Sequence, residues 1–222
     1  MKKSKAAAEI ELMFNKIAKS YDFLNNLISA FSHILIKKSS VEFLGIQNGS
    51  SVLDLCTGSG DLAEIIKKKY PKCQIIGADF SDEMLKIAKK KGFDIEYLKE
   101  DATNLSFDDG TFDYVVMGFG LRNIPDKQAA LSEVVRVLSP GGKFLHLDFG
   151  EKNLISNFAD IFILAIAKIF SKNFNAYKYL VESKKGFLSP HELISKAENC
   201  SLKFLRRKDF LFKTVTCEVF EK

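Results

Sequence analysis

A glycine-rich turn offers the clearest chemistry in this sequence. The segment from Gly58 to Ala63 matches the pattern GxGxxA, and it stands between a short apolar run, Ser51–Cys56, and a stretch with helical character, Leu62–Lys69. A turn of this kind between a strand and a helix exposes backbone amides that bind the polar part of a nucleotide-like cofactor. The pattern by itself fits a dinucleotide as well as S-adenosylmethionine (SAM).

Acidic residues around the turn separate these two cofactors. Asp54 precedes the glycines, and Asp61 directly follows Gly60. Two carboxylates in these positions would repel a pyrophosphate. SAM has no phosphate, and its ammonium and sulfonium groups are favoured by nearby acids, while the amides of the turn can bind its carboxylate. The charge pattern therefore favours SAM over a dinucleotide.

Further acids follow the next two predicted strands. Asp79 ends the strand Gln74–Ala78 and can accept hydrogen bonds from both hydroxyls of a ribose. Asp101-Ala102 follows the strand Ile95–Leu98, where the carboxylate can accept from the exocyclic amine of adenine and the alanine amide can donate to a ring nitrogen. A single acid at a strand end could equally cap a helix. The ordered set at successive strand ends predicts a SAM site.

The elements that position these residues alternate between strands and helices. Short apolar runs of strand type are separated by segments with helical periodicity, which predicts a mostly parallel sheet with helices on both faces. Beyond the three strands above, we expect strands at Phe112–Met117 and Lys143–Phe149, with Lys203–Phe212 and Val215–Phe220 as an antiparallel pair at the sheet edge. The predicted helices are Ile10–Leu24 with a break near Ser20, one ending near Gly45, Leu62–Lys69, Met84–Lys91, Ala129–Leu138 and His191–Asn199.

The length of 222 residues suits one domain. We expect a single unit over residues 1–222, which divides into an N-terminal helical cap (1–48), a cofactor-binding core (49–150), helices of a substrate lid (151–190) and a C-terminal helix with edge strands (191–222).

Composition excludes several classes of protein. The four cysteines form no CxxC pair, so we expect no zinc ribbon and no metal. Lysine makes up most of the 33 basic residues, and only four are arginine, which disfavours a nucleic-acid reader. The basic N-terminus turns acidic before any apolar run, and the apolar stretch 153–171 is interrupted by Asp160 and Lys168. These features predict a cytoplasmic protein without a signal peptide or a transmembrane helix.

Several longer motifs carry a family resemblance. VLDLCTGSGDLA, GADFSDEMLKIAKKK, DATNLSFDDGTFDYVV and LSPGGKF resemble class I SAM-dependent methyltransferases, which have a Rossmann-like α/β fold. FNKIAKSYDFLNNLIS, GFGLRNIPDKQAALSEVVRVLSPGG and AYKYLVES resemble the ubiquinone/menaquinone biosynthesis C-methyltransferase family. The resemblance extends from about Met13 to Ser195.

This resemblance implies methyl transfer from SAM to a ring carbon of a polyprenylated quinol. We expect conversion of demethylmenaquinol to menaquinol, with a 2-methoxy-6-polyprenyl-1,4-benzoquinol or another small molecule as alternative substrates. A non-catalytic partner protein with this fold is the alternative from a different class. The expected SAM contacts are Asp54, Thr57, Gly58, Gly60, Ala63, Asp79, Phe80, Asp101, Ala102 and Gly118, although Ala63 and Gly118 stand where the family often has hydroxyl residues.

Methylation of a ring carbon requires removal of a proton from the quinol and stabilisation of the resulting oxyanion. The hypothesis for this chemistry is Asp61 as the base, directly or through a water, with Arg122 stabilising the phenolate and Asn123 orienting it. Asp61 could instead be a first-turn helix acid or a ligand of the SAM amine. Arg122 could instead form a surface salt bridge with Asp126.

The substrate implies an apolar pocket near a membrane. Phe14, Tyr21, Tyr177 and Tyr179 could close over SAM and the ring, and Phe158 lies on an apolar face of the stretch 153–171 that suits an isoprenoid tail. Residues 1–50 carry seven lysines against four acids, and residues 151–222 carry thirteen bases against eight acids. We therefore expect peripheral contact with anionic lipid on the inner face of the membrane. The sequence leaves the oligomeric state open, a homodimer included.

Overall fold

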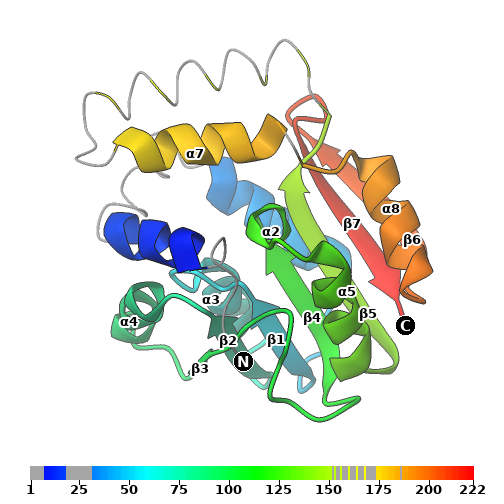
Figure 1. Cartoon of the computed structure of the whole chain (residues 1–222). Coiled ribbons are helices and arrows are strands. Elements are labelled where there is room, and N and C mark those ends of the chain that lie inside the picture. The colour runs from blue at the N-terminus through cyan, green and yellow to red at the C-terminus, as the bar shows by residue number, and fades with distance from the viewer. Residues whose placement is uncertain are drawn as a thin grey trace.

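The computed structural model describes residues 8–18, 32–151, 153, 156, 160, 164, 168, 174–185 and 187–222 (Figure 1). Its centre is a seven-stranded sheet with the order β3-β2-β1-β4-β5-β7-β6. The strands are β1 (Ser51–Leu55), β2 (Gln74–Asp79), β3 (Glu96–Lys99), β4 (Phe112–Gly118), β5 (Leu138–Phe149), β6 (Lys203–Phe210) and β7 (Val215–Glu221). The five strands from β3 to β5 pair in parallel, whereas β7 pairs with β5 and β6 in antiparallel fashion. The predicted α/β class and the antiparallel edge pair are confirmed.

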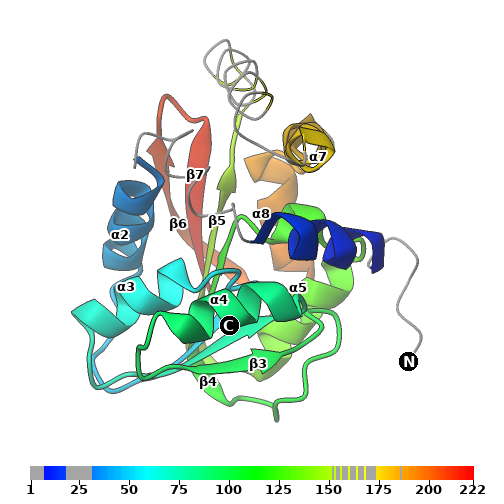
Figure 2. The same ribbon diagram turned by 90° about the vertical axis from the view of Figure 1, so that its left-hand side faces the viewer.

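Helices cover both faces of the sheet, as predicted. A helix over residues 8–18 starts the described chain. The later helices are α2 (Ser32–Leu44), α3 (Asp61–Lys69), α4 (Asp82–Lys90), the 3₁₀ turn η1 (Leu121–Asn123), α5 (Lys127–Val137), α7 (Phe174–Lys185) and α8 (Pro190–Asn199). One apolar core joins the sheet to α2, α3 and α4, and the other joins the opposite face to α5 and α8. Figure 2 shows the sheet nearly edge-on between these two layers.

Local chemistry explains several helix boundaries. Ser81 begins α4 by accepting a hydrogen bond from the amide of Met84. Ser189 begins α8 with a full capping box, in which Glu192 bonds back to the amide of Ser189. The end of α5 differs from the prediction, since the helix ends at Val137 and β5 already begins at Leu138. Leu138 pairs with Phe112 before the Pro-Gly-Gly turn interrupts the ladder, and the regular register resumes at Lys143.

The strand order creates a crevice at one edge of the sheet. β1 lies between β2 and β4. After β1 the chain forms β2 and β3 on one side of it, and then crosses to form β4 and β5 on the other side. Ligands of such sheets bind beyond the carboxyl ends of the strands at this switch point. The glycine turn follows β1, Asp79 ends β2, and the segment Gly118–Asn123 follows β4. The fold therefore brings the predicted cofactor residues to one place.

Within the described part of the chain, no helix is long and apolar enough to cross a membrane. The described residues also contain no group of three or more His, Cys, Asp or Glu side chains arranged to hold a metal ion.

Candidate functional site

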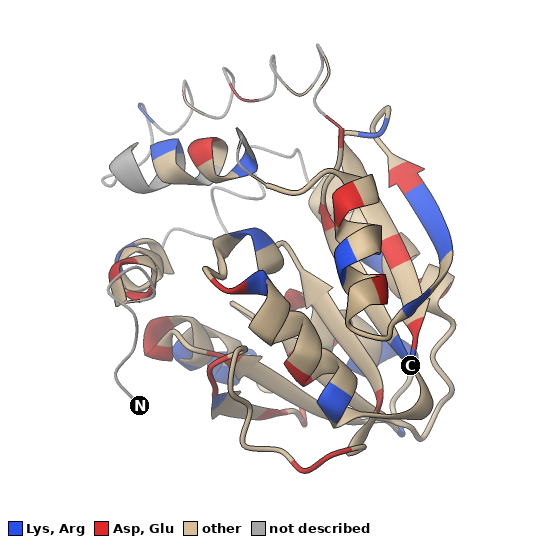
Figure 3. Cartoon of the chain, turned by 45° about the vertical axis from the view of Figure 1, so that its right-hand side comes forward, with Lys and Arg blue, Asp and Glu red and all other residues tan. Residues whose placement is uncertain are grey.

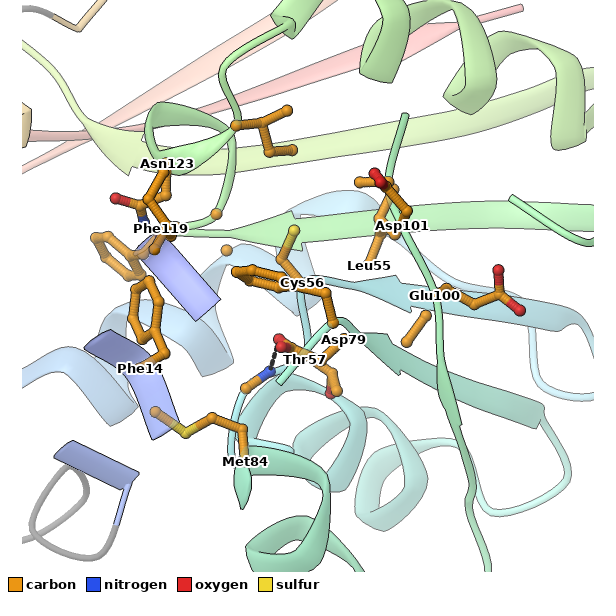
Figure 4. Close-up of a pocket in the computed structure, with 18 of the residues that line it drawn as sticks. Phe14, Leu55, Cys56, Thr57, Asp79, Met84, Glu100, Asp101, Phe119 and Asn123 are labelled. Atoms are coloured by element: carbon orange, nitrogen blue, oxygen red, sulfur yellow. Dashed lines mark hydrogen bonds between the residues drawn. The ribbon is translucent and has the colours of Figure 1, made fainter. Parts of the chain in front are cut away.

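A cavity of about 360 Å³ opens at the carboxyl ends of β1, β2 and β4. Figure 4 shows that Phe14, Phe119 and Asn123 gather at one end, whereas Glu100 and Asp101 lie at the other. The predicted site residues that line the cavity are Phe14, Thr57, Gly58, Asp79, Phe80, Asp101, Ala102, Gly118 and Asn123. The structure thus brings together segments that follow four different strands.

The glycine turn depends on backbone conformations that favour glycine. Gly60 has φ +88° and caps the start of α3, and a Cβ there would lie 2.6 Å from Tyr97 Oη. Gly58 has φ +57°, and a Cβ there would meet nothing within 4 Å. The turn is therefore packed against Tyr97 on one side and open at Gly58, which lines the cavity.

Asp54 stabilises the glycine turn through hydrogen bonds and does not line the cavity. Its Oδ2 accepts hydrogen bonds from Thr57 Oγ1 at 2.6 Å and from the Ala63 amide at 3.0 Å. Burial raises the pKa of the Asp54 carboxyl to about 7, although these two bonds oppose the rise. Ala63, predicted to contact SAM, also lies off the cavity wall and contributes its amide to this network.

Asp79 joins the turn to the cavity. Its Oδ2 accepts from the Gly58 amide at 2.9 Å, drawn dashed in Figure 4, and its Oδ1 accepts from the Ser81 amide at 2.9 Å. The residue is only 8% exposed, and burial raises the pKa of its carboxyl to about 6 against the effect of these amides. The Phe80 amide also bonds to this carboxylate, so three amides share its four lone pairs and one acceptor position remains for a ligand hydroxyl. This geometry suits a hydroxyl of a ribose.

Asp101 is braced by its own turn. Its Oδ1 accepts from the Thr103 amide at 2.9 Å and from Thr103 Oγ1 at 2.7 Å. Ala102 is buried beside it, and both residues line the same end of the cavity. The arrangement is compatible with the predicted contact to an adenine.

Asn123 presents an unpaired acceptor at the opposite end. Its Nδ2 donates to the carbonyl oxygen of Phe119 at 3.4 Å. Its Oδ1 is buried and receives no hydrogen bond from the described residues. A buried polar atom without a partner is costly, and this one belongs to a residue on the cavity wall. Asn123 is therefore suited to bind a hydroxyl group of a ligand.

Arg122, its neighbour, points into the protein. Its Nη1 donates to Asp148 Oδ1 at 2.7 Å and to the carbonyl oxygen of Phe119 at 2.7 Å. The guanidinium carbon lies 5.0 Å from the centre of the Phe149 ring. The alternative of a surface salt bridge with Asp126 is wrong, because Asp126 caps α5 through the Ala129 amide and Arg122 is buried. Arg122 does not line the cavity.

Asp61 is also away from the cavity wall. Lys37 Nζ lies 2.7 Å from its Oδ2, Lys91 Nζ lies 2.9 Å from its Oδ1, and His33 Nε2 is 4.0 Å away. Burial alone would raise the pKa of Asp61, but the two ammonium groups outweigh it and lower the pKa far below its usual range. A carboxylate held in this way accepts a proton poorly. The hypothesis of Asp61 as the base finds no support in this geometry.

Comparison with known proteins decides the family. Residues 1–218 match the model of the ubiE/COQ5 methyltransferase family. The chain belongs to this family. Among curated relatives of this ubiE/COQ5 protein, the demethylmenaquinone methyltransferase of Thermus thermophilus is 38% identical over 82% of the chain and 87% of the relative. The protein of the same name from Bacillus cytotoxicus is 35% identical over 90% of each chain.

Solved structures of other methyltransferases have the same fold as this chain. A SAM-dependent methyltransferase from Thermotoga maritima superposes with a TM-score of 0.70 and 21% identity, covering 96% of the ubiE/COQ5 chain and 99% of that chain. A methyltransferase from Haloferax volcanii, in complex with its activator Trm112, has a TM-score of 0.72 and 17% identity over 94% and 96% of the two chains. The ubiE/COQ5 chain is thus a SAM-dependent methyltransferase with the class I fold.

Some site residues of this ubiE/COQ5 protein were missed by sequence reasoning. Lys37, Met84 and Phe119 line the cavity. Lys37 comes from α2, far from the glycine turn in sequence, and no local pattern marks it. Phe119 has φ +58°, an uncommon conformation for a residue of its size, which orients it toward Asn123 and Phe14.

The predicted substrate contacts are placed only in part. Tyr21 and Phe158 lie outside the described residues, as does the side chain of Tyr177. Tyr179 is half-buried on α7, where burial raises the pKa of its hydroxyl and nearby Arg122 opposes the rise. It does not line the cavity.

Proposed function

We propose that this methyltransferase methylates a ring carbon of a polyprenylated quinol, with demethylmenaquinol as its substrate. The observation that carries the proposal is the match to relatives named demethylmenaquinone methyltransferase, which are 34–38% identical over 82–91% of the chain. A benzoquinol is the second candidate, because the matched family model joins ubiE and COQ5 proteins in one group.

The cavity residues fit SAM as the methyl donor. We assign Asp79 to the ribose hydroxyls, since it is a buried carboxylate on the cavity wall. We assign Asp101 and Ala102 to the adenine, with Thr57, Gly58, Phe80 and Gly118 completing the wall. Asp54, Gly60 and Ala63 form or stabilise the glycine turn without lining the cavity. SAM supplies an electrophilic methyl group on its sulfonium when it is bound.

The aromatic end of the cavity suits the quinol ring. Phe14 and Phe119 offer flat apolar surfaces beside Asn123 Oδ1, the buried acceptor without a partner among the described residues. An amide oxygen is too weak a base to take the proton, so Asn123 would orient the quinol hydroxyl while its proton passes to solvent water, and the resulting phenolate makes the neighbouring ring carbon nucleophilic. Asn123 is therefore the residue that we expect to touch the substrate.

Arg122 and Asp61 act indirectly in this proposal. Arg122 fixes the carbonyl of Phe119, the same oxygen that accepts from Asn123 Nδ2, so it positions both side chains of the aromatic end. Asp61 positions Lys37, a residue of the cavity wall whose ammonium lies 2.7 Å from Asp61 Oδ2. A cation at this point is suited to the carboxylate of SAM.

A polyprenyl quinol resides in a lipid bilayer, so we propose that the enzyme works at the cytoplasmic surface of the membrane. Its lid over residues 151–190, with Tyr21, Phe158, Tyr177 and Tyr179 around the substrate, stays a prediction. The absence of a metal, the absence of nucleic-acid partners and a homodimer also stay predictions.

Quinone profiling tests the proposed substrate. Cells that lack the protein should accumulate demethylmenaquinone, and the wild-type gene should restore menaquinone. A gene carrying Asn123→Ala should fail to restore it, whereas Asp94→Ala, a change in an almost fully exposed side chain, should succeed. Accumulation of a demethylated benzoquinone instead would move the assignment to the second candidate, and an unchanged profile would refute both.

A further inference from the structure

The hairpin that joins β6 to β7 ends in an exposed apolar tip. Leu211 is 50% exposed and Phe212 is 81% exposed. Hairpin tips usually carry Gly, Asn, Asp or Ser. Leu211, Phe212 and Lys213 instead adopt left-handed backbone conformations, with φ of 47°, 53° and 68°. Bulky residues disfavour this region, so the apolar side chains occupy positions where local stability would favour glycine or asparagine.

The tip is held firmly despite these conformations. The amide of Thr214 donates to the carbonyl oxygen of Leu211 at 3.1 Å, and Asn153 Nδ2 donates to that of Phe212 at 2.8 Å. The Glu151 amide donates to the carbonyl oxygen of Lys213 at 2.9 Å. The carbonyl oxygens of Leu211, Phe212 and Lys213 thus all accept hydrogen bonds from nearby residues. These bonds hold the turn in a conformation that leaves the side chains of Leu211 and Phe212 exposed.

The hairpin tip lies at the same end of the sheet as the cofactor cavity. Val215 at the start of β7 pairs with Phe149 at the carboxyl end of β5. The tip therefore projects from the edge at which the parallel strands end and the cavity opens. Figure 1 shows the hairpin turn beside the end of β5, at the upper end of the sheet.

The first turn of α2 extends this apolar surface. Arg206 contacts the carbonyl oxygen of Phe43, and Lys208 contacts Ser39 Oγ, so α2 runs antiparallel to β6. Leu35, 67% exposed, thus lies toward the tip. Figure 2 shows α2 alongside the hairpin.

Basic residues surround the apolar side chains. Arg207, Lys208 and Lys213 lie on the hairpin and Lys38 lies on α2; Asp209 pairs with Arg207 at 2.7 Å, and Glu151 lies 3.8 Å from Arg207 and from Lys213, so these four bases outnumber the two acids. Figure 3 shows a basic residue at the turn itself and basic residues along β6. A surface of exposed apolar groups with an excess of cations complements an anionic lipid surface.

We propose that the β6–β7 tip, formed by Leu211, Phe212 and Lys213 with Leu35 beside it, inserts into the surface of an anionic bilayer. The inference rests on the proposed function, since it supplies the reason for the cavity edge to face the lipid that holds the quinol. It adds a membrane contact that is separate from the apolar stretch 153–171.

Sedimentation with lipid vesicles tests this contact. The purified full-length chain would be mixed with vesicles of phosphatidylcholine containing about one third phosphatidylglycerol. Phe212→Asn removes the ring and places a residue that tolerates the left-handed conformation, so the variant should fold at least as stably. We expect its vesicle binding to fall roughly tenfold, as burial of one aromatic ring would predict. Phe212→Leu keeps an apolar side chain and should retain most of the binding.

Two further controls separate this contact from general effects. Leu12→Asn removes an exposed apolar residue from the helix 8–18 and should leave vesicle binding intact. Lys213→Glu should weaken binding to the anionic vesicles, whereas Lys72→Glu, in the turn before β2 at the opposite edge of the sheet, should not.

The outcome is independent of the proposed reaction. All tip variants should methylate a reduced naphthoquinone head group without a prenyl tail at the wild-type rate. If the wild type fails on this compound, the proposed function fails while the vesicle result stands. Equal vesicle binding by Phe212→Asn and the wild type would overturn the membrane contact, as would a change in oligomeric state in place of lost lipid binding.

Discussion

Arg122 and Asp148 form a buried ion pair behind the aromatic end of the cavity. The distance from Arg122 Nη1 to Asp148 Oδ1 is 2.7 Å, and the two side chains are 5% and 0% exposed. Asp148 ends the run of buried residues in β5, and Arg122 belongs to η1, so the pair joins two strand ends. It fixes the turn that carries Phe119 and Asn123, and it gives Arg122 a positioning role.

Removing one charge of this pair should be costly. Asp148→Asn leaves the guanidinium buried without its counter-ion, and we expect the free energy of unfolding to fall by about 3 kcal/mol. Urea denaturation of the purified protein measures this change. Asp209→Asn breaks the more exposed pair with Arg207 and should cost less than about 1 kcal/mol. Similar losses of unfolding free energy in both variants would show that burial does not make the Arg122–Asp148 pair more important for stability than an exposed pair.

Asp61 gives a second test, because the sequence and the structure assign it different roles. If it positions Lys37, Asp61→Asn should weaken SAM binding by roughly tenfold while kcat at saturating SAM stays within about threefold. Calorimetric titration with SAM and steady-state kinetics provide the two values. A loss of about 100-fold or more in kcat with unchanged SAM affinity would instead restore the base hypothesis.

The ion-pair partners of Asp61 and Arg122 could not be predicted from the sequence. The glycine turn and Asp79 were predictable, because each is marked by its place at the end of an apolar strand and the strand order brings such ends together. The partners of Asp61 and Arg122 lie 24 to 30 residues away and arrive through tertiary packing. A polar residue within an apolar strand, as at Asp148, was the one signal in the sequence for the buried pair.

SAM binding should depend on pH through Asp79. Burial raises the pKa of this carboxyl to about 6, so below that pH it keeps a proton and loses acceptor capacity. We expect SAM affinity to increase as the pH rises through about 6. Because this pKa lies above the unfolded value, the folding stability that the group contributes is present at low pH and is lost as the pH rises through about 6.

Asp79→Asn separates this effect from that of Asp54, whose carboxyl has a pKa of about 7 because of its burial. The variant should bind SAM at least roughly tenfold more weakly, since a charge-assisted acceptor is lost, and its affinity should no longer change near pH 6. Calorimetric titrations at a series of pH values measure both. An unaltered pH profile in the variant would remove Asp79 from the cofactor site.

Gly118 is set by a close contact with Leu62. A Cβ at Gly118 would lie 2.6 Å from Leu62 Cδ1. Gly118→Ser should therefore destabilise the protein by about 1–3 kcal/mol. The added change Leu62→Ala creates room, so the double variant should lose less than the sum of the two single losses in thermal unfolding. Additive losses would mean that Leu62 does not cause the strain.

Methyl transfer from SAM to a demethylated menaquinol can be measured directly. Purified protein would be incubated with reduced demethylmenaquinone and SAM bearing a trideuterated methyl group, and the extracted quinones analysed by mass spectrometry. We expect menaquinone that carries the trideuterated methyl on its ring, and none with Asn123→Ala. Unlabelled quinone from the wild type, or label confined to a benzoquinol offered in parallel, would contradict it.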